Sequence, residues 1–202
     1  MRTFRIALWG LVALVAVLLA GATFVGSRED AAVASTGVRI GGPFELVDQR
    51  GETVTRDDLI GTPHAVFFGY TFCPDVCPTT LWEMSEHLEA LGDDPNLKVV
   101  FVSVDPERDT PEALADYVSA FDERILALTG PKARIDEAVG AYRATYTIHE
   151  PDERGDVLID HTASVMLFDE TGTFRGTIAY GEDFRTARAK LERLTGRDAA
   201  AS

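Results

Sequence analysis

The chain has 202 residues and carries 33 acidic against 19 basic side chains, which gives a formal net charge of −14. This acidity argues against nucleic acid and anionic lipid as partners, and its simplest role is solubility. The length beyond residue 42 suffices for one compact domain with its own core, and no internal repeat marks a second domain.

An uncharged apolar run from Ile6 to Val25 follows Arg2 and Arg5. A run of about 20 apolar residues can cross a membrane as a helix, and the two arginines mark its cytoplasmic side. We therefore expect residues 1–26 to be an uncleaved anchor in a bacterial inner membrane, residues 27–42 a linker, and the following domain to be periplasmic. A cleaved signal peptide is the competing interpretation, with small-residue cleavage sites at 20–22 or 32–34.

Residues 43–196 predict a single α/β domain, and residues 197–202 a short tail. In chain order we expect strands at 44–47 and 52–54, a helical turn at 55–61, a strand at 65–70, a helix at 79–91, a strand at 97–104, a helix at 111–121, a strand at 125–129, a helix at 131–140, a polar segment with a hairpin at 145–159, strands at 163–168 and 173–180, and a helix at 184–194. This order predicts a mixed sheet with helices on both faces and resembles a thioredoxin-like domain.

The only two cysteines, Cys73 and Cys77, lie between the strand at 65–70 and the helix at 79–91. A helix N-terminus favours thiolate over thiol, so we expect Cys77 to be the more acidic thiol, although Asp75 opposes ionisation. A disulfide closing so short a loop would stabilise little, so the pair indicates redox or metal chemistry. A Cys73–Cys77 disulfide is feasible if the turn lets the two Cα atoms approach within about 7 Å, and it would exclude metal, because it offers no thiolate.

Four histidines compete to be a third metal ligand. His161 is the best candidate, because it reaches the cysteine edge of the sheet if the strand after it runs antiparallel, with Asp160 as an orienting group. We expect His64 to be structural or exposed, His87 to lie on the surface and His149 to be solvated. Two thiolates and an imidazole suit Cu(I), whereas zinc usually takes a fourth ligand. The residues alone leave His161 open between ligand and structural histidine.

Three blocks of sequence resemble the Sco/SenC family: residues 69–78, 104–110 and 160–162. The similarity runs from about Phe44 to Leu194. Members of this family are membrane-anchored, thioredoxin-like copper proteins that act in cytochrome c oxidase assembly. The resemblance implies that copper is held by Cys73, Cys77 and His161, and that Asp75 and the Asp105 loop support these ligands or face a partner.

The resemblance implies a copper metallochaperone that delivers copper to the dinuclear site of cytochrome c oxidase subunit II. Other periplasmic copper chaperones and a thiol reductant are further implied partners. The alternative is a thiol–disulfide oxidoreductase acting on the cysteines of that same site. Thioredoxin enzymes, however, carry Cys-x-x-Cys and a proline before the strand that faces it, whereas here three residues intervene and no proline directly precedes Val165. A copper sensor is a further alternative, and a peroxidase is weaker because Thr71 lies at the wrong spacing.

Overall fold

The computed structural model describes residues 39–92 and 97–197 of the chain. The chain divides after Arg39, and the features below belong to the unit that begins at Ile40. This unit starts slightly before the predicted boundary at residue 43, and the Gly41 N–H already donates to the Ala141 carbonyl at 3.0 Å. The predicted anchor lies outside the described residues. Within the described ranges, no helix is long and apolar enough to cross a membrane.

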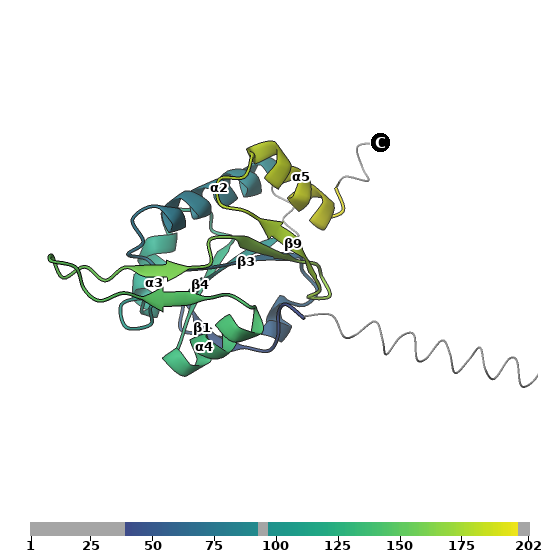
Figure 1. Ribbon diagram of the computed structural model, residues 1–202. Coiled ribbons are helices and arrows are strands. Elements are labelled where there is room, and N and C mark those ends of the chain that lie inside the picture. The colour runs from purple at the N-terminus through teal and green to yellow at the C-terminus, as the bar shows by residue number, and fades with distance from the viewer. Residues whose placement is uncertain (1–38, 93–96, 198–202) are drawn as a thin grey trace, which may run out of the picture. The chain divides into compact units, whose positions relative to one another are not determined.

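A seven-stranded mixed sheet forms the centre of the unit, in the order β2-β1-β5-β4-β3-β8-β9 (Figure 1). Its strands are β1 (Glu45–Asp48), β2 (Thr53–Thr55), β3 (His64–Gly69), β4 (Lys98–Ser103), β5 (Ile125–Thr129), β8 (Val165–Phe168) and β9 (Phe174–Ile178). Strands β3, β4 and β5 run parallel, with Gly69 paired to Ser103. Strand β8 runs antiparallel to β3, as the sequence analysis required for His161 to reach the cysteines. A separate two-stranded ribbon pairs β6 (Tyr146–Ile148) with β7 (Ile159–His161).

Helices cover both faces of the sheet, as the sequence predicted. The helices are α2 (Val76–Leu91), α3 (Pro111–Val118), α4 (Lys132–Ala141) and α5 (Phe184–Leu194), with a short 3-10 helix, η1, at Arg56–Leu59. Helices α2 and α5 lie together above the sheet in Figure 1, and their side chains His87 and Phe184 stack with ring centroids 4.2 Å apart. Helix α4 lies below the sheet in the same view.

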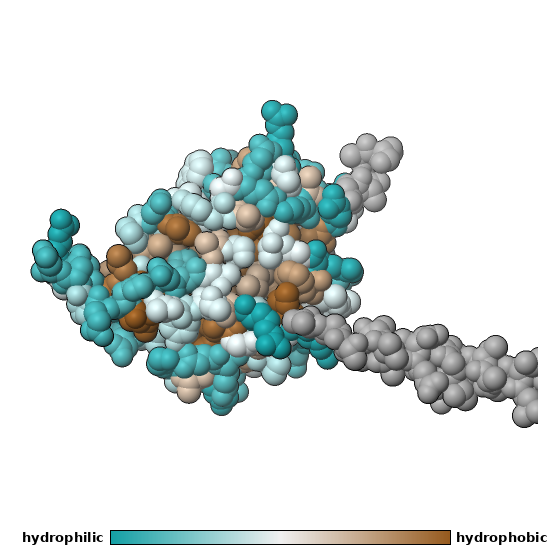
Figure 2. Space-filling view, in the orientation of Figure 1, coloured by the Kyte–Doolittle hydropathy of each residue, from teal (hydrophilic) through white to brown (hydrophobic). Residues whose placement is uncertain are grey.

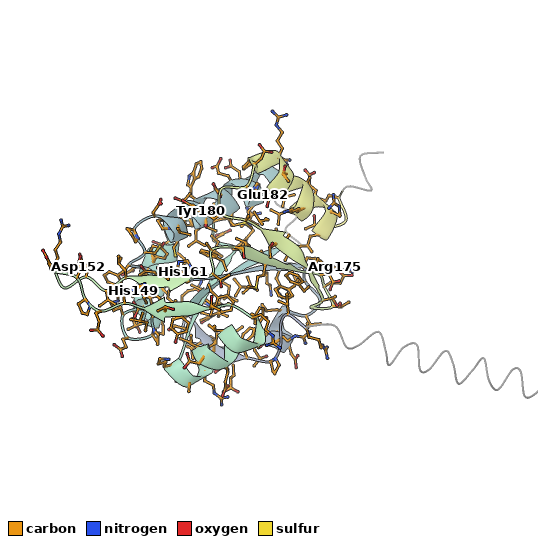
Figure 3. All side chains as sticks on the ribbon, viewed as in Figure 1. His149, Asp152, His161, Arg175, Tyr180 and Glu182 are labelled. Carbon is orange, nitrogen blue, oxygen red and sulfur yellow. The ribbon has the colours of Figure 1, made fainter. Side chains whose placement is uncertain are left out.

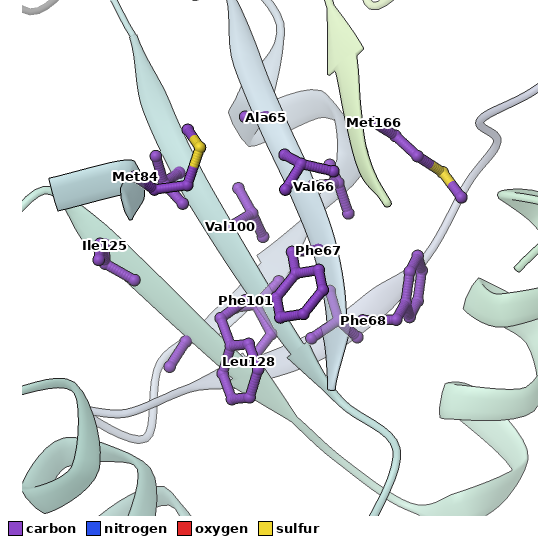
Figure 4. Packing of buried hydrophobic residues seen from close by; sticks show 14 of the residues in the cluster. Ala65, Val66, Phe67, Phe68, Met84, Val100, Phe101, Ile125, Leu128 and Met166 are labelled. Carbon is purple, nitrogen blue, oxygen red and sulfur yellow. The ribbon is translucent and has the colours of Figure 1, made fainter. Parts of the chain in front are cut away.

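Successive side chains along β3 and β4 point to opposite faces of the sheet, so the core is divided between the two faces that the helices cover. Phe67 and Phe101 point to one face, where the ring of Phe101 lies 5.9 Å from that of Tyr117 on α3. Phe68 points to the other face and meets Tyr142 at the end of α4, with ring centroids 5.8 Å apart. Figure 4 shows Phe67, Phe68 and Phe101 packed with other buried side chains around β3 and its neighbours. All six residues of β3 are buried, which fits the apolar run that follows His64.

Most predicted elements are present, and the differences occur at their ends. Helix α5 and strand β5 match the predicted bounds. Helix α2 begins at Val76 rather than residue 79, so Cys77 lies inside its first turn instead of before it. Helix α3 opens as predicted, with Thr110 as N-cap accepting from the Ala113 N–H at 3.2 Å and Pro111 as its first residue, but it ends at Val118 rather than residue 121.

Candidate metal centre

The cysteine loop places both sulfur atoms at the N-terminus of α2. Strand β3 ends at Gly69, the Cys73 N–H donates to the Tyr70 carbonyl at 3.3 Å, and the loop turns back over the first turn of the helix. The Cys77 N–H then donates to the Cys73 sulfur at 3.4 Å. This N–H is one of the helix-terminal groups that lack a partner within the helix, so it is available to hold the sulfur.

The ribbon of β6 and β7 places His161 beside the two sulfur atoms. Its Nε2 lies 3.3 Å from the Cys77 sulfur and 3.9 Å from the Cys73 sulfur. The three donor atoms all lie within 4.8 Å of one another. In Figure 3, His161 lies close to the body of the sheet, whereas His149 and Asp152 lie progressively farther out along the ribbon. The structure thus brings together the three residues singled out as metal ligands.

The surroundings of His161 prepare its ring for metal binding. Its Nδ1 lies 3.2 Å from the Thr162 carbonyl, which fixes the proton on Nδ1 and leaves the Nε2 lone pair facing the sulfurs. Burial lowers the pKa of His161 below its usual value, so the ring is neutral near pH 7. The rings of Phe67 and Tyr70 contact it edge-on at 5.8 and 5.9 Å between centroids.

Burial overturns the expected acidity of Cys77. Its side chain is 0% exposed, and the resulting desolvation raises the pKa of the thiol far above its ordinary value. The prediction from the helix N-terminus is therefore wrong, because loss of solvent outweighs the helix dipole at this position. A metal that binds here must displace the Cys77 proton, so binding releases protons and strengthens as the pH rises.

The donor set has a clear chemical preference. Two sulfurs and one imidazole nitrogen suit a soft ion such as Cu(I) in trigonal coordination. Among the described residues, no further histidine, cysteine or carboxylate joins the three, although a structural zinc site usually has four protein ligands. Both cysteines are free thiols in the structure, as metal binding requires.

Comparison with known proteins identifies the family. A model of the SCO1/SenC family matches residues 32–196. The chain belongs to the SCO1/SenC family. The resemblance seen in the three sequence blocks is therefore confirmed, and it extends over the whole described unit.

Curated SCO1/SenC relatives include proteins from mitochondria and bacteria. The human mitochondrial SCO1 homologue is 39% identical over 138 residues, covering 67% of this chain and 46% of the human protein. Protein SenC of Rhodobacter capsulatus is 36% identical over 175 residues, covering 83% of this chain and 79% of that protein. The chain thus spans about half of the human relative and most of the bacterial one.

Solved structures of SCO1/SenC relatives share the fold. ScoI of Bradyrhizobium japonicum with copper bound is 44% identical, with a TM-score of 0.71, covering 77% of this chain and 99% of that one. Yeast Sco1 with copper bound is 32% identical, with a TM-score of 0.73, covering 78% of this chain and 89% of that one. The thioredoxin-like α/β fold predicted for residues 43–196 is the fold of these proteins.

The three predicted supporting acids occupy different positions in this SCO1/SenC domain. Asp75 is the N-cap residue of α2, and its carboxylate accepts from the Tyr180 hydroxyl at 3.4 Å. Asp105 is buried and pairs with Arg108. The Asp160 carboxylate lies 2.8 Å from His149 Nε2, so it binds that exposed ring, while the Thr162 carbonyl orients His161.

Two of the other histidines are structural. His64 is buried, with its Nδ1 2.9 Å from the Thr62 carbonyl and its ring stacked on Phe168. His87 is 3% exposed, so its predicted surface position is wrong. It lies on the inner face of α2, seven residues after Thr80, and α5 covers that face. His149 is exposed, as predicted.

Sequence reasoning missed Asp109, which joins the cysteine loop to β4. Its carboxylate accepts from the Thr71 N–H at 3.1 Å, the Thr71 hydroxyl at 2.5 Å and the Ser103 hydroxyl at 2.6 Å. The side chain is 0% exposed, and burial raises the pKa of Asp109 despite these bonds. The only signal in the sequence was its place in the loop after a buried strand, where Asp105 drew attention instead.

Arg108 is a second residue with an unpredicted role. It pairs with Asp105, donates to the Val157 carbonyl of the ribbon at 3.1 Å and lies over the ring of Phe72 at 4.7 Å. Phe72 is 60% exposed and lies in the cysteine loop. Arg108 therefore connects the loop after β4, the cysteine loop and the ribbon that carries His161.

The surface beside the centre is partly apolar. Ile148 and Leu158, near the base of the β6–β7 ribbon, are exposed. Figure 2 shows hydrophobic side chains toward the base of this ribbon and hydrophilic ones at its tip. This arrangement offers an apolar contact surface on the ribbon that carries His161.

Proposed function

We propose that this protein is a copper metallochaperone that binds one copper ion through Cys73, Cys77 and His161. The observation that carries the proposal is the convergence of these three soft donors at one edge of the sheet. Two solved relatives, the Bradyrhizobium and yeast proteins, have copper bound on the same fold. With two thiolates and a neutral imidazole, the site carries a net charge of −1 with Cu(I) and zero with Cu(II), and a partly exposed edge tolerates both.

The acceptor that we propose is the dinuclear copper site of cytochrome c oxidase subunit II, since family membership implies a role in assembling that oxidase. The position of the donors supports transfer by ligand exchange. Cys77 is fully enclosed, whereas Cys73 lies in the loop at the molecular edge and is 9% exposed. Cys73 is therefore the ligand that an incoming acceptor thiolate displaces first.

A thiol–disulfide oxidoreductase is the second candidate, because the two free thiols face one another at the helix N-terminus. In that reaction the Cys73 thiolate would attack the acceptor disulfide, and Cys77 would then release the acceptor as a Cys73–Cys77 disulfide forms. The raised pKa of Cys77 opposes this second step, because the thiolate is the attacking species. We therefore rank copper delivery first.

We also propose that the domain is tethered to the bacterial inner membrane and acts in the periplasm. The support is the apolar run behind Arg2 and Arg5. Recovery of a soluble mature protein that begins near Thr23 or Ser35 would replace the anchor with a cleaved signal peptide.

The test compares copper stoichiometry and disulfide-reductase activity on the same reduced protein. We expect one copper per chain, lost in Cys73→Ser, Cys77→Ser and His161→Ala, and unchanged in the control His149→Ala. Transfer of copper to purified subunit II domain should exceed any reduction of its oxidised cysteines. Unchanged copper in the three ligand variants would place the metal elsewhere, and reductase activity without copper transfer would select the second candidate.

A further inference from the structure

Acidic side chains are concentrated on the two segments that carry the metal ligands. The sequence has 19 lysine and arginine residues, and none lies between residues 57 and 97, a stretch that includes both cysteines and all of α2. The β6–β7 ribbon, residues 146–161, has five acidic side chains and a single basic one, Arg154. Helix α5, by contrast, carries four basic residues. The surroundings of the metal centre are therefore more uniformly negative than the molecule as a whole.

These acids border the metal centre on two sides. On α2, Asp75, Glu83 and Glu86 follow at spacings of eight and three residues, which places them along one stripe of the helix. Asp75 is exposed, and the other two are partly exposed. On the ribbon, Glu150 and Asp160 are exposed. A cationic group that approaches the centre is therefore attracted from both sides.

Exposed apolar side chains lie between the two acidic borders. Phe72 of the cysteine loop is 60% exposed, and the Arg108 guanidinium lies 4.7 Å from the centre of its ring. Arg108 also donates to a ribbon carbonyl, so Phe72 lies beside the ribbon, where Ile148 and Leu158 are exposed. Arg108 does not cancel the acidic borders, because it pairs with Asp105. An apolar centre inside a polar rim is the usual anatomy of a protein–protein interface.

The sign of these charges decides which class of partner fits. Nucleic acid and anionic lipid are repelled at this surface, because both are polyanions. A second copy of the chain, paired symmetrically through the same surface, would set the acidic borders against one another. A protein with a basic contact face, in contrast, is attracted over a distance of about one Debye length, roughly 8 Å at physiological salt.

We propose that the three exposed apolar side chains and the acidic borders on either side of them form a docking surface for the copper acceptor. The acceptor would present a ring of lysine or arginine side chains around an apolar depression that receives Phe72. Its identity as acceptor rests on the copper delivery proposed above, whereas the charge pattern does not. Attraction between the two faces raises the rate of encounter, and burial of the Phe72 ring slows dissociation.

The first experiment measures how fast the reduced, copper-free full chain, in uncharged detergent micelles, binds the purified copper-free subunit II domain. We expect the association rate to fall at least about tenfold as the salt concentration rises from about 0.05 to about 0.5 M. Glu86→Lys and Glu150→Lys, one on each border, should each lower the rate roughly threefold or more at low salt.

Glu52→Lys is the matched control, because it changes the net charge by the same amount. Glu52 is exposed in the turn between β1 and β2. Gln49 of this turn bonds to Ala127 and Ile125 near the start of β5, which is the end of the sheet away from the cysteines. The association rate should be unchanged in this variant.

The second experiment removes the apolar anchor. Phe72→Ala should weaken the affinity of the same copper-free pair about fivefold or more, mainly through faster dissociation. Phe72→Leu, which keeps an apolar side chain, should lose less. Neither protein carries metal in this measurement, so a change in copper binding cannot account for the loss. Equal affinity in Phe72→Ala and the parent protein would overturn the role of Phe72.

Copper transfer from the loaded chain to the same domain is measured in parallel. Transfer that ignores salt and both charge reversals would overturn the docking surface and leave copper delivery standing. Salt-dependent binding that both reversals weaken, without copper transfer, would support the docking surface and remove copper delivery. Equal effects of Glu52→Lys and Glu150→Lys would attribute the attraction to net charge and overturn the proposal. Self-association in sedimentation that Phe72→Ala abolishes would do the same, because it would assign the surface to a second copy.

Discussion

Gly69 determines how closely α2, which carries Cys77, approaches the sheet. It is the last residue of β3, directly beneath the side chain of Cys77. A Cβ atom at this position would lie 2.6 Å from the Cys77 sulfur and 2.7 Å from Cε2 of Phe101. Both distances are shorter than non-bonded contacts allow, and both neighbours are buried. Only glycine fits here without displacing a candidate metal ligand.

We therefore predict that Gly69→Ala weakens copper binding and destabilises the domain. Inserting a carbon into a packed core costs about 1–3 kcal/mol, and here the strain falls on Cys77. Thermal unfolding and chelator competition measure the two effects. Gly140→Ala on α4 is the matched control, because an added Cβ meets nothing within 4 Å there. It should stabilise the domain by up to about 1 kcal/mol and leave copper unchanged. Equal copper binding in both variants would contradict this account.

Local sequence patterns predicted the position of the two cysteines but not their burial. The strand-to-helix turn in the sequence correctly predicted that both sulfurs lie near a helix N-terminus. It could not reveal that α2 starts at Val76 and buries Cys77, which reverses the expected acidity of that thiol. Burial depends on tertiary packing, and Cys77 lies against His161, whose Nε2 is 3.3 Å from its sulfur although the two residues are 84 positions apart in the sequence. Asp109 was overlooked for the same reason, since its partner Thr71 lies 38 residues away.

At the scale of elements, the site depends on how the β6–β7 ribbon is held against the sheet. The ribbon meets the body through three side chains. The Tyr70 hydroxyl accepts from the Ile159 N–H at 3.2 Å, Arg108 donates to the Val157 carbonyl, and the Tyr146 hydroxyl donates to Asp136 on α4. The Tyr70 side chain is buried, so it provides a fixed support. Arg108 adds a connection that reaches both the cysteine loop and the ribbon.

We predict that Arg108→Ala loosens the ribbon and speeds copper loss. The change removes the ion pair with Asp105, the hydrogen bond to Val157 and the contact with the Phe72 ring. Because Asp105 is left buried without its cation, we expect a cost of about 1–3 kcal/mol. Hydrogen exchange at the ribbon amides should accelerate more than exchange in the sheet. Arg134→Ala, which breaks an exposed pair with Glu137, is the control and should change neither property. Unaltered ribbon exchange in Arg108→Ala would contradict this role, because it would show that the contacts of Tyr70 and Tyr146 hold the ribbon without Arg108.

Sequence patterns predicted the elements of the sheet better than the ribbon. Strand β5 and helix α5 were predicted at their true bounds, because each has a continuous apolar or amphipathic pattern between clear end signals. The residues around His161 are polar, and β7 is a strand only because it pairs with β6. The prediction that His161 lies near the cysteines therefore depended on β8 running antiparallel to β3. The thioredoxin-like order of elements implied that direction, and the structure shows it.

At the scale of the whole molecule, buried histidines couple stability to pH. Burial lowers the pKa of His64, His87 and His161 in the folded state. The unfolded chain then binds protons more readily than the folded one below the ordinary histidine pKa of about 6.5. The contribution of these histidines to the free energy of unfolding is therefore fully present above that pH, and it is lost as the pH falls toward their lowered folded-state pKa values. Acids with lowered pKa values, such as Asp48 and Asp169, act in a separate window below about pH 4.

We predict that the metal-free domain loses stability as the pH falls below about 6.5, by at most about 1.4 kcal/mol per pH unit for each histidine. Denaturant unfolding at a series of pH values measures the slope. His64→Leu and His87→Leu should each flatten it. An unchanged slope in both buried variants would assign the effect to other groups.

The whole molecule should also exist in two mutually exclusive states, one with copper and one with a disulfide. The two sulfurs lie within 4.8 Å of one another, and a disulfide requires about 2 Å. Cys77 is fixed in α2 and fully buried, so the closing movement belongs to Cys73 in its loop. Oxidation removes two protons and two electrons from the thiols and leaves no thiolate to bind metal, while the sheet and its helices stay folded.

We predict that treatment with diamide, which accepts these two electrons, produces an intrachain Cys73–Cys77 bond and a protein that retains little copper. Mass spectrometry of the oxidised chain and a parallel copper assay measure both properties, and reduction should restore binding. Circular dichroism should remain unchanged, because the movement is confined to the loop. Cys73→Ser is the control: it cannot close the bond, and diamide should not alter its mass by loss of two hydrogens. Full copper binding by protein whose disulfide is intact would show that the metal uses other ligands, because neither sulfur in a disulfide can act as a thiolate donor.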